Sequence, residues 1–223
     1  MLKGIDVSSW QGNIQVQNMP VDFVIAKATE GLTYVNEFCD PVIRNSIQGC
    51  KLWGFYHYGQ CNEPREEADY FIDNTINYFG SGIPVLDWEE NQSVEWVNIF
   101  VNRVHERTGV WPWIYANPWR FNQGGVNPNC GRWVASYPDV VNPGLDYDPG
   151  EPPATDGLVC CYQFASDGVV DGYNGNLDLN VFYGDATAWM AYCGISTNGE
   201  QNVENSESVI VENDHYKVEI TTK

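Results

Sequence analysis

The feature that most constrains the fold is an alternation of short apolar runs with segments of helical periodicity. Eight runs have the length and composition of β-strands, near 3–8, 21–27, 51–58, 83–89, 112–116, 131–135, 158–164 and 177–182. Helical patterns are predicted near 36–49, after Pro64, over 93–108 and near 185–192. Such alternation favours a largely parallel sheet. Eight strands in so short a chain favour a closed barrel, because an open sheet would leave edges to cover.

The second half of the chain is less regular. Segments 111–135 and 142–157 are rich in Pro, Gly and Asn, which is typical of loops and turns. We therefore predict an α/β fold over residues 1–195: an irregular, TIM-like barrel of eight strands with few helices in its second half.

The end of the chain reads as an appendage. Residues 196–208 form a polar linker pattern, and residues 209–223 read as a β-hairpin with Asn213 and Asp214 at the turn. Tyr216, Val218 and Ile220 would share one face of it. Because a lone hairpin is barely stable in water, we expect it to pack on the barrel, to mediate self-association or to begin a further module.

Composition excludes several classes of partner. The net charge is −19, from 30 acidic and 11 basic residues, which argues against nucleic acid and against an anionic membrane surface. The seven cysteines include no CxxC pair and do not cluster with histidine, so we expect reduced, mostly buried thiols, no metal and no cofactor. We see no signal peptide and no run of transmembrane length, and expect synthesis in the cytoplasm.

Asp87 and Glu89 are the first candidates for chemistry. They lie two residues apart at the end of the fourth predicted strand, so they share a face. Neighbouring carboxylates repel, which leaves one protonated and one ionised, as glycosidic bond cleavage requires. On spacing alone, a solvated strand end paired with Lys or Arg is an equally good interpretation.

Two further acids strengthen the first interpretation. Asp6 lies on the first predicted strand and Asp178 on the eighth, and these strands are neighbours in a closed barrel. The fourth strand then lies across the mouth from both. Four carboxylates that converge from opposite walls are unfavourable for stability and indicate a functional role.

The order of motifs resembles the family 25 glycoside hydrolases, the Chalaropsis-type lysozymes or N-acetylmuramidases that are common among phage endolysins. The matching stretches are GIDVSSWQG (4–12), FVIAKATEG (23–31), GFYHY (54–58), PVLDWE (84–89), WIYAN (113–117), WVASY (133–137), YQF (162–164) and GNLDLN (175–180). The resemblance covers roughly residues 3–192.

The resemblance implies a catalytic barrel that cuts the β-1,4 bond between N-acetylmuramic acid and N-acetylglucosamine of bacterial peptidoglycan. Glu89 corresponds to the general acid and Asp87 to the assisting or nucleophilic carboxylate, while Asp6 and Asp178 match the remaining two aspartates. The enzyme would act at the cell wall, after synthesis in the host cytoplasm if it comes from a phage. The hairpin would then begin a wall-binding or oligomerisation module.

We expect Glu89 to hold a proton at neutral pH, with its pKa raised by Asp87, the other acids and nearby aromatic rings. Asp87 either attacks the sugar directly or, as we prefer, assists attack by the substrate's own acetamido group. A wider carboxyl separation would admit water and invert the anomer. Candidates to line the sugar cleft, with core packing as an equal alternative, are Tyr56, Tyr115, Trp133 and Gln163.

Other interpretations remain. A non-catalytic wall-binding module would require the loss of a catalytic acid, and none is lost. A chitinase-like enzyme usually carries a longer acidic signature, but Val85 stands where that signature has an acid. His57 alternates with two tyrosines and is expected to be structural, and Lys27 with Glu30 is expected to form a salt bridge.

Overall fold

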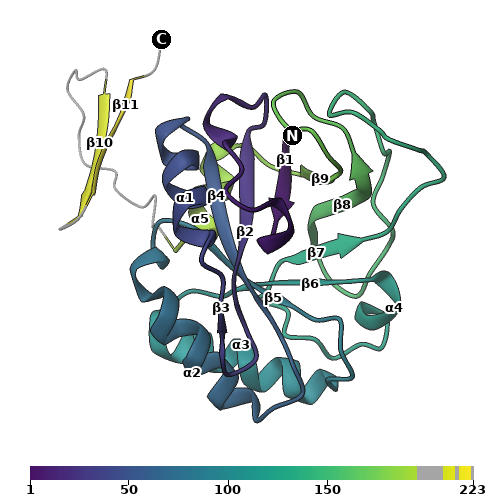
Figure 1. Cartoon of the computed structure of the whole chain (residues 1–223). Helices are drawn as coiled ribbons and strands as arrows, with labels where there is room; N and C mark the ends of the chain where they lie inside the picture. Colours follow the sequence, from purple (N-terminus) through teal and green to yellow (C-terminus); the bar gives the residue numbers. More distant parts are fainter. Residues whose placement is uncertain (195–207, 214–215, 222–223) are drawn as a thin grey trace.

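The computed structural model describes residues 1–194, 208–213 and 216–221 (Figure 1). Eight strands close into a barrel because β1 pairs with both β2 and β9. They are β1 (Leu2–Val7), β2 (Phe23–Glu30), β4 (Leu52–Tyr58), β5 (Ile83–Asp87), β6 (Trp113–Ala116), β7 (Arg132–Ala135), β8 (Val159–Gly168) and β9 (Leu177–Phe182). These are the eight predicted strands, and the predicted fold class is confirmed. A two-residue strand, β3 (Tyr34–Val35), pairs with the end of β2.

The sheet is mixed, because β9 runs antiparallel to both of its neighbours. The other barrel pairings are parallel. Parallel neighbours need a long crossover, whereas residues 169–176 alone join β8 to β9. The short connection therefore forces the last strand to reverse, which is a departure from the largely parallel sheet that the alternation predicted.

Helices cover the first half of the barrel (Figure 1). They are α1 (Cys39–Gln48), α2 (Pro64–Thr75) and α3 (Val94–Thr108), with α5 (Ala186–Tyr192) after β9. All four were expected. The single turn α4 (Pro118–Phe121) and the 3-10 turns η1 (Ser9–Gln11), η2 (Val16–Asn18) and η3 (Ile76–Tyr78) were not. None of the helices in the described ranges is both long and apolar enough to span a membrane.

One end of the barrel is filled by an aromatic plug from α5. The Trp189 ring lies 4.7 Å from Phe23, 5.4 Å from Trp113 and 5.2 Å from Phe182, measured between ring centroids. Phe23 and Trp113 begin their strands and Phe182 ends the reversed strand, so all three lie at the same end. This apolar packing leaves the opposite end, where the parallel strands finish, for polar side chains.

The hairpin predicted at the end of the chain is present. Strands β10 (Ser208–Asn213) and β11 (Tyr216–Thr221) are antiparallel, with Val209 opposite Ile220 and Val211 opposite Val218. The predicted linker up to residue 207 and the turn residue Asp214 lie outside the described residues. Self-association through this hairpin stays a prediction.

Candidate active site

A pocket of about 360 Å³ opens at the carboxyl end of the parallel strands. All eight side chains singled out from the sequence line it: Asp6, Tyr56, Asp87, Glu89, Tyr115, Trp133, Gln163 and Asp178. Seven of them lie on seven different strands, and side-chain alternation turns each toward the barrel axis. The eighth, Glu89, lies just past the end of β5. The pocket therefore lies where barrel enzymes place their chemistry.

Asp6 and Asp178 are direct register partners on β1 and β9. Asp6 is near the end of its strand and Asp178 near the start of its own, so the two meet only because β9 is reversed. Burial is the main cause that raises the pKa of both carboxyls, to about 6 for Asp178. The Asp178 charge raises the pKa of Asp6 further. The expectation that these two acids meet is confirmed.

A buried hydrogen-bond network orients Asp6. Gln163 donates to Asp6 Oδ2 at 2.8 Å and Asn180 donates to the same oxygen at 2.7 Å. The Tyr115 hydroxyl donates to Gln163 Oε1 at 2.7 Å, and the Trp133 indole donates to Asn180 Oδ1 at 2.8 Å. The polar atoms of Gln163 and Trp133 are thus occupied by protein partners, and these two side chains form the floor of the pocket.

Asp87 ends β5 and is 7% exposed. Burial is the largest cause that raises its pKa, followed by the charges of Glu89 and Asp6, while Lys27 lowers it. Its Oδ1 has no hydrogen-bond partner among the described residues. A buried, unpaired carboxylate oxygen is costly, so this atom points to a ligand that supplies a donor.

Glu89 lies two residues beyond Asp87, just past the strand, and is exposed at the mouth. Partial burial of its carboxyl is the main cause that raises its pKa; Glu90 adds to this, and Arg120 and Lys27 oppose it. The sequence predicts that Asp87, the other acids and the aromatic rings raise it. The Glu89 charge instead raises the pKa of the more deeply buried Asp87.

A family model decides the relationship of this chain to known proteins. The model of the glycosyl hydrolases family 25 matches residues 5–173. The chain belongs to this family. It is thereby a glycoside hydrolase, and the resemblance read from the motifs is confirmed.

Individual relatives agree with the family assignment. This family 25 hydrolase is 30% identical over 200 residues to the autolytic lysozyme of Clostridium acetobutylicum, covering 81% of the chain but only 56% of that protein. It is also 30% identical to lysozyme M1 of Streptomyces globisporus, over 85% of the chain and 70% of the relative. The crystal structure of the bacterial lysozyme from Streptomyces coelicolor superposes with a TM-score of 0.74 at 26% identity, covering 86% of the chain and 96% of that structure.

Three residues of the hydrolase site were not among the sequence candidates. Asn180 shares the inner face of β9 with Asp178, and the same alternation could have identified it. Tyr137 donates to Gln163 Oε1 at 2.7 Å. Arg120 donates to the backbone carbonyl of Glu89, and its guanidinium carbon lies 5.3 Å from the centre of the Trp88 ring. No periodicity in the sequence marks the single turn that carries Arg120.

Lys27 completes the charged groups at the mouth. Its ammonium pairs with Glu30 at 2.6 Å, as predicted, and lies 4.8 Å from the centre of the Tyr58 ring. Gln60 donates to the other Glu30 oxygen at 2.7 Å and so fixes the pair. Lys27 is therefore held near the acids by protein contacts.

His57 is structural, as expected from its alternation with two tyrosines. It is fully buried outside the barrel wall, with Nδ1 2.9 Å from the Thr29 hydroxyl and Nε2 3.0 Å from Glu67. Glu67 also accepts the backbone N–H groups of Gln60 and Asn62 at 2.8 and 2.9 Å. This pair thus links α2 to the loop that follows β4.

Proposed function

We propose that this chain is a lysozyme, an N-acetylmuramidase that hydrolyses the β-1,4 bond between N-acetylmuramic acid and N-acetylglucosamine in bacterial peptidoglycan. The observation that carries the proposal is the Asp87–Glu89 pair in the pocket of a family 25 fold: a buried carboxylate with a free oxygen beside a partly exposed acid of raised pKa. The names of the relatives, lysozymes of Clostridium and Streptomyces, support the same substrate.

Glu89 acts as the general acid in this proposal. Its carboxyl is at the mouth, where a glycosidic oxygen can reach it, and its raised pKa favours the protonated form that a leaving group needs. A bound sugar would displace water from the mouth and strengthen the burial that raises this pKa. Glu89 would therefore be a better acid catalyst in the complex than in the free enzyme.

Asp87 assists attack by the acetamido group of the substrate. An acetamido N–H is a hydrogen-bond donor, and Asp87 Oδ1 is a buried acceptor without a partner in the described chain. A hydrogen bond between them would orient the acetamido carbonyl oxygen toward the anomeric carbon and stabilise the positive charge that develops on the acetamido group. Direct attack by Asp87 is the alternative, and both routes retain the anomeric configuration.

Asp6 and Asp178 form the opposite wall. Asp6 is fixed by Gln163 and Asn180, and Asp178 is more open to the pocket. We propose that Asp178 adds negative charge near the oxocarbenium-like centre, while Asp6 holds Asp178 in position. Tyr56 and Tyr115 would contact the sugar from the walls. The site of action is the cell wall; origin from a phage endolysin stays a prediction.

The first experiment compares wild type with Glu89→Gln in the loss of turbidity of purified Gram-positive cell walls. We expect the variant to lose at least about 100-fold in rate, because a general acid contributes on that order. Glu95→Gln, an exposed acid at the start of α3, is the matched control and should lyse walls at the wild-type rate. Equal lysis by Glu89→Gln would refute the assignment.

The second experiment follows the anomeric configuration of the first product by NMR. Retention is expected for both routes through Asp87, whereas inversion would rule them out and require a water between the two carboxyls. Hydrolysis of chitin oligomers without hydrolysis of cell walls would indicate that the substrate is another aminosugar polymer.

A further inference from the structure

The exposed tryptophans of this chain both lie at the end of the barrel that carries the pocket. All nine tryptophans of the chain lie within residues 1–194, and only Trp10 and Trp119 are exposed, by 90% and 70%. Trp10 follows β1 by three residues and Trp119 follows β6 by three residues, so both lie in loops at the end of the barrel that carries the acids. A single exposed apolar residue needs no explanation, but two exposed tryptophans at the same end of the barrel indicate a binding surface.

Both tryptophans lie on short turns that are fixed by hydrogen bonds from capping side chains. Trp10 is the middle residue of η1, where the Ser8 N–H donates to Gln11 Oε1 at 2.9 Å and the Trp10 N–H donates to Ser8 Oγ at 3.3 Å. Trp119 is in α4, whose first turn is capped by Asn117 Oδ1 at 3.1 Å from the Arg120 N–H. A rigid turn presents an aromatic face with little loss of entropy on binding.

The two tryptophans lie on opposite sides of the mouth. Around the closed barrel, β6 is four strands away from β1 in either direction. Asp6 precedes Trp10 by four residues, and the neighbour of Trp119, Arg120, contacts the backbone of Glu89. The carboxylates therefore lie between the two loops that carry these tryptophans, across a backbone ring about 15 Å wide for eight tilted strands.

We infer that Trp10 and Trp119 are two sugar-stacking platforms that hold a glycan strand on both sides of the bond to be cut. The inference rests on the proposed function. Sugar rings present C–H faces that pack on indole rings. Lys27 and Arg120, the cations near the acids, are occupied by Glu30 and by Glu89 with Trp88. Aromatic contact at the rim would therefore add to the hydrogen bonds that the pocket offers to a glycan strand.

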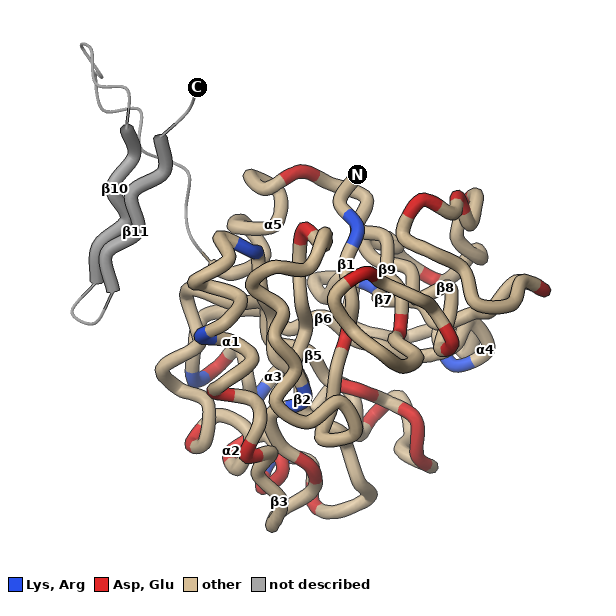
Figure 2. The backbone as a smooth tube through the Cα atoms, turned by 45° about the horizontal axis from the view of Figure 1, so that its top comes forward, with Lys and Arg blue, Asp and Glu red and all other residues tan. Residues whose placement is uncertain are grey.

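Basic residues are few in the second half of the barrel. Acidic residues spread over the molecule, whereas lysine and arginine gather mainly by α1 to α3 (Figure 2). Between residues 121 and 194 the single basic residue is Arg132, which is buried. Apart from Arg120, which is held by the Glu89 carbonyl, this side of the barrel offers few cations to the carboxylates of N-acetylmuramic acid, so contact with the sugar rings themselves is the more available interaction.

The test measures hydrolysis of soluble, uncross-linked glycan strands and of a disaccharide-length substrate by Trp10→Ala, Trp119→Ala and the two Phe variants. Each Ala variant is expected to raise KM on strands about fivefold to tenfold with kcat within about twofold, and each Phe variant to recover most of it. On the short substrate KM should not change, because it does not reach the rim. Leu158→Ala, exposed at the opposite end of the barrel, is the control.

A binding measurement tests this inference independently of the proposed function. Strands are titrated into Glu89→Gln with and without the Trp→Ala changes, and Kd is measured by isothermal titration calorimetry. If wild type cuts no strands, the muramidase proposal fails, but weaker binding of the Trp→Ala proteins would still support the platforms. A KM and a Kd within twofold of the parent for both Ala variants would overturn the inference, as would equal KM increases on long and short substrates.

Discussion

Asp87 and Glu89 come from one short stretch of sequence but ionise in different surroundings. Asp87 is buried with an unpaired oxygen, whereas Glu89 faces the open mouth beside Arg120. Alternation along a strand was enough to predict that the two share a face. It could not predict which of them is the more deeply buried, because that depends on where β5 ends and on the loops around the mouth.

Glu89 should define the alkaline limit of activity. A general acid works only while protonated, so the rate should fall as the pH rises through the Glu89 pKa, which is raised above the ordinary value. Because the Arg120 charge lowers that pKa, Arg120→Gln should move the alkaline limb of the kcat/KM profile to higher pH. Arg44→Gln, an exposed arginine on α1, should leave it unchanged. A limb that stays in place in Arg120→Gln would contradict this electrostatic coupling.

We expect ionised Asp87 to lower the unfolding free energy of the protein. Its pKa is raised in the folded state, so the ionised form is disfavoured by folding, and the cost grows as the pH rises from the unfolded pKa, about 4, to the folded one. At pH 7, Asp87→Asn should stabilise the protein by roughly 1–3 kcal/mol and abolish wall lysis.

The measurement for Asp87→Asn is urea unfolding at pH 7 and at pH 3.5. The gain in unfolding free energy should shrink at the lower pH, where wild-type Asp87 is largely protonated in both states. Asp139→Asn, at an exposed position, should change stability little at either pH. A gain of the same size at both pH values would show that the effect is not due to ionisation.

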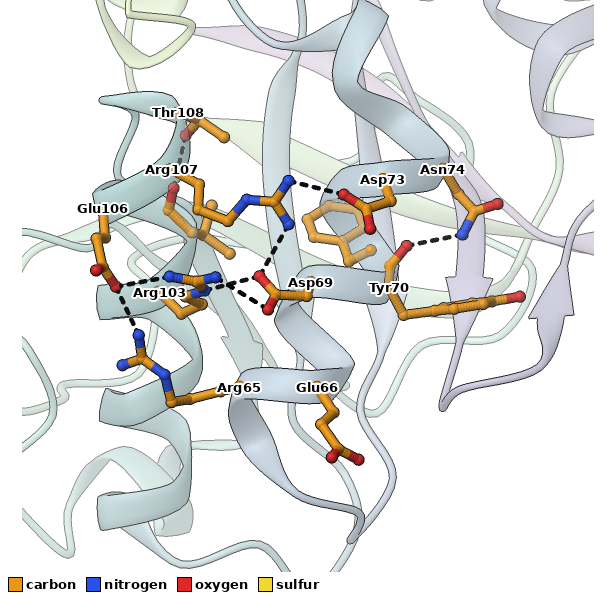
Figure 3. A network of polar contacts seen from close by, with 12 residues as sticks. Arg65, Glu66, Asp69, Tyr70, Asp73, Asn74, Arg103, Glu106, Arg107 and Thr108 are labelled. Atoms are coloured by element: carbon orange, nitrogen blue, oxygen red, sulfur yellow. Dashed lines mark hydrogen bonds and ion pairs between the residues drawn. The ribbon is translucent and has the colours of Figure 1, made fainter.

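At the scale of elements, α2 and α3 are joined by ion pairs that periodicity does not reveal (Figure 3). Arg103 contacts both oxygens of Asp69, at 2.7 and 3.0 Å, and Arg107 bridges Asp69 and Asp73 at 2.9 and 2.7 Å. The sequence predicted both helices from their apolar stripes. The pairing of their polar faces depends on how the helices lie on the barrel.

Asp69→Asn should lower the unfolding free energy by about 1 kcal/mol at pH 7, the scale of a partly exposed ion pair. The hydrogen bond from Arg103 is the main cause that lowers the Asp69 pKa in the folded state. Its contribution is therefore present above the unfolded pKa, about 4, and is lost as the pH falls through the folded one. The difference between variant and wild type in denaturant unfolding should disappear once the pH lies below the lowered Asp69 pKa. Asp73→Asn, which loses one exposed pair, should have the smaller effect.

At the scale of the whole molecule, apolar packing at one end of the barrel stabilises the fold, and the acidic pocket is at the other end. Trp189 fills the end opposite the acids, so Trp189→Ala should cost about 3–5 kcal/mol in urea unfolding. Activity per folded molecule should persist, since the pocket is at the far end. Thr187→Ala, on the exposed side of α5, is the control and should cost little. Loss of activity in fully folded Trp189→Ala would show that the two ends are coupled.

The sequence by itself determined the eight strands, the main helices and the residues that face the barrel axis. Local patterns suffice for these, because apolar periodicity and side-chain alternation act over a few neighbouring residues. The direction of β9 is different. It follows from the short connection after β8, and it alone brings Asp178, at the start of its strand, opposite Asp6, near the end of β1.

Only the tertiary structure decided the electrostatics of the site. The free oxygen of Asp87, the contact of Arg120 with Glu89 and the placement of Trp10 across from Trp119 each join segments far apart in the chain. Burial and charge act through space, so no pattern in the sequence specifies them. Local sequence patterns therefore identify the acidic residues of the site, whereas closure of the barrel determines how deeply each of them is buried and which charges lie near it.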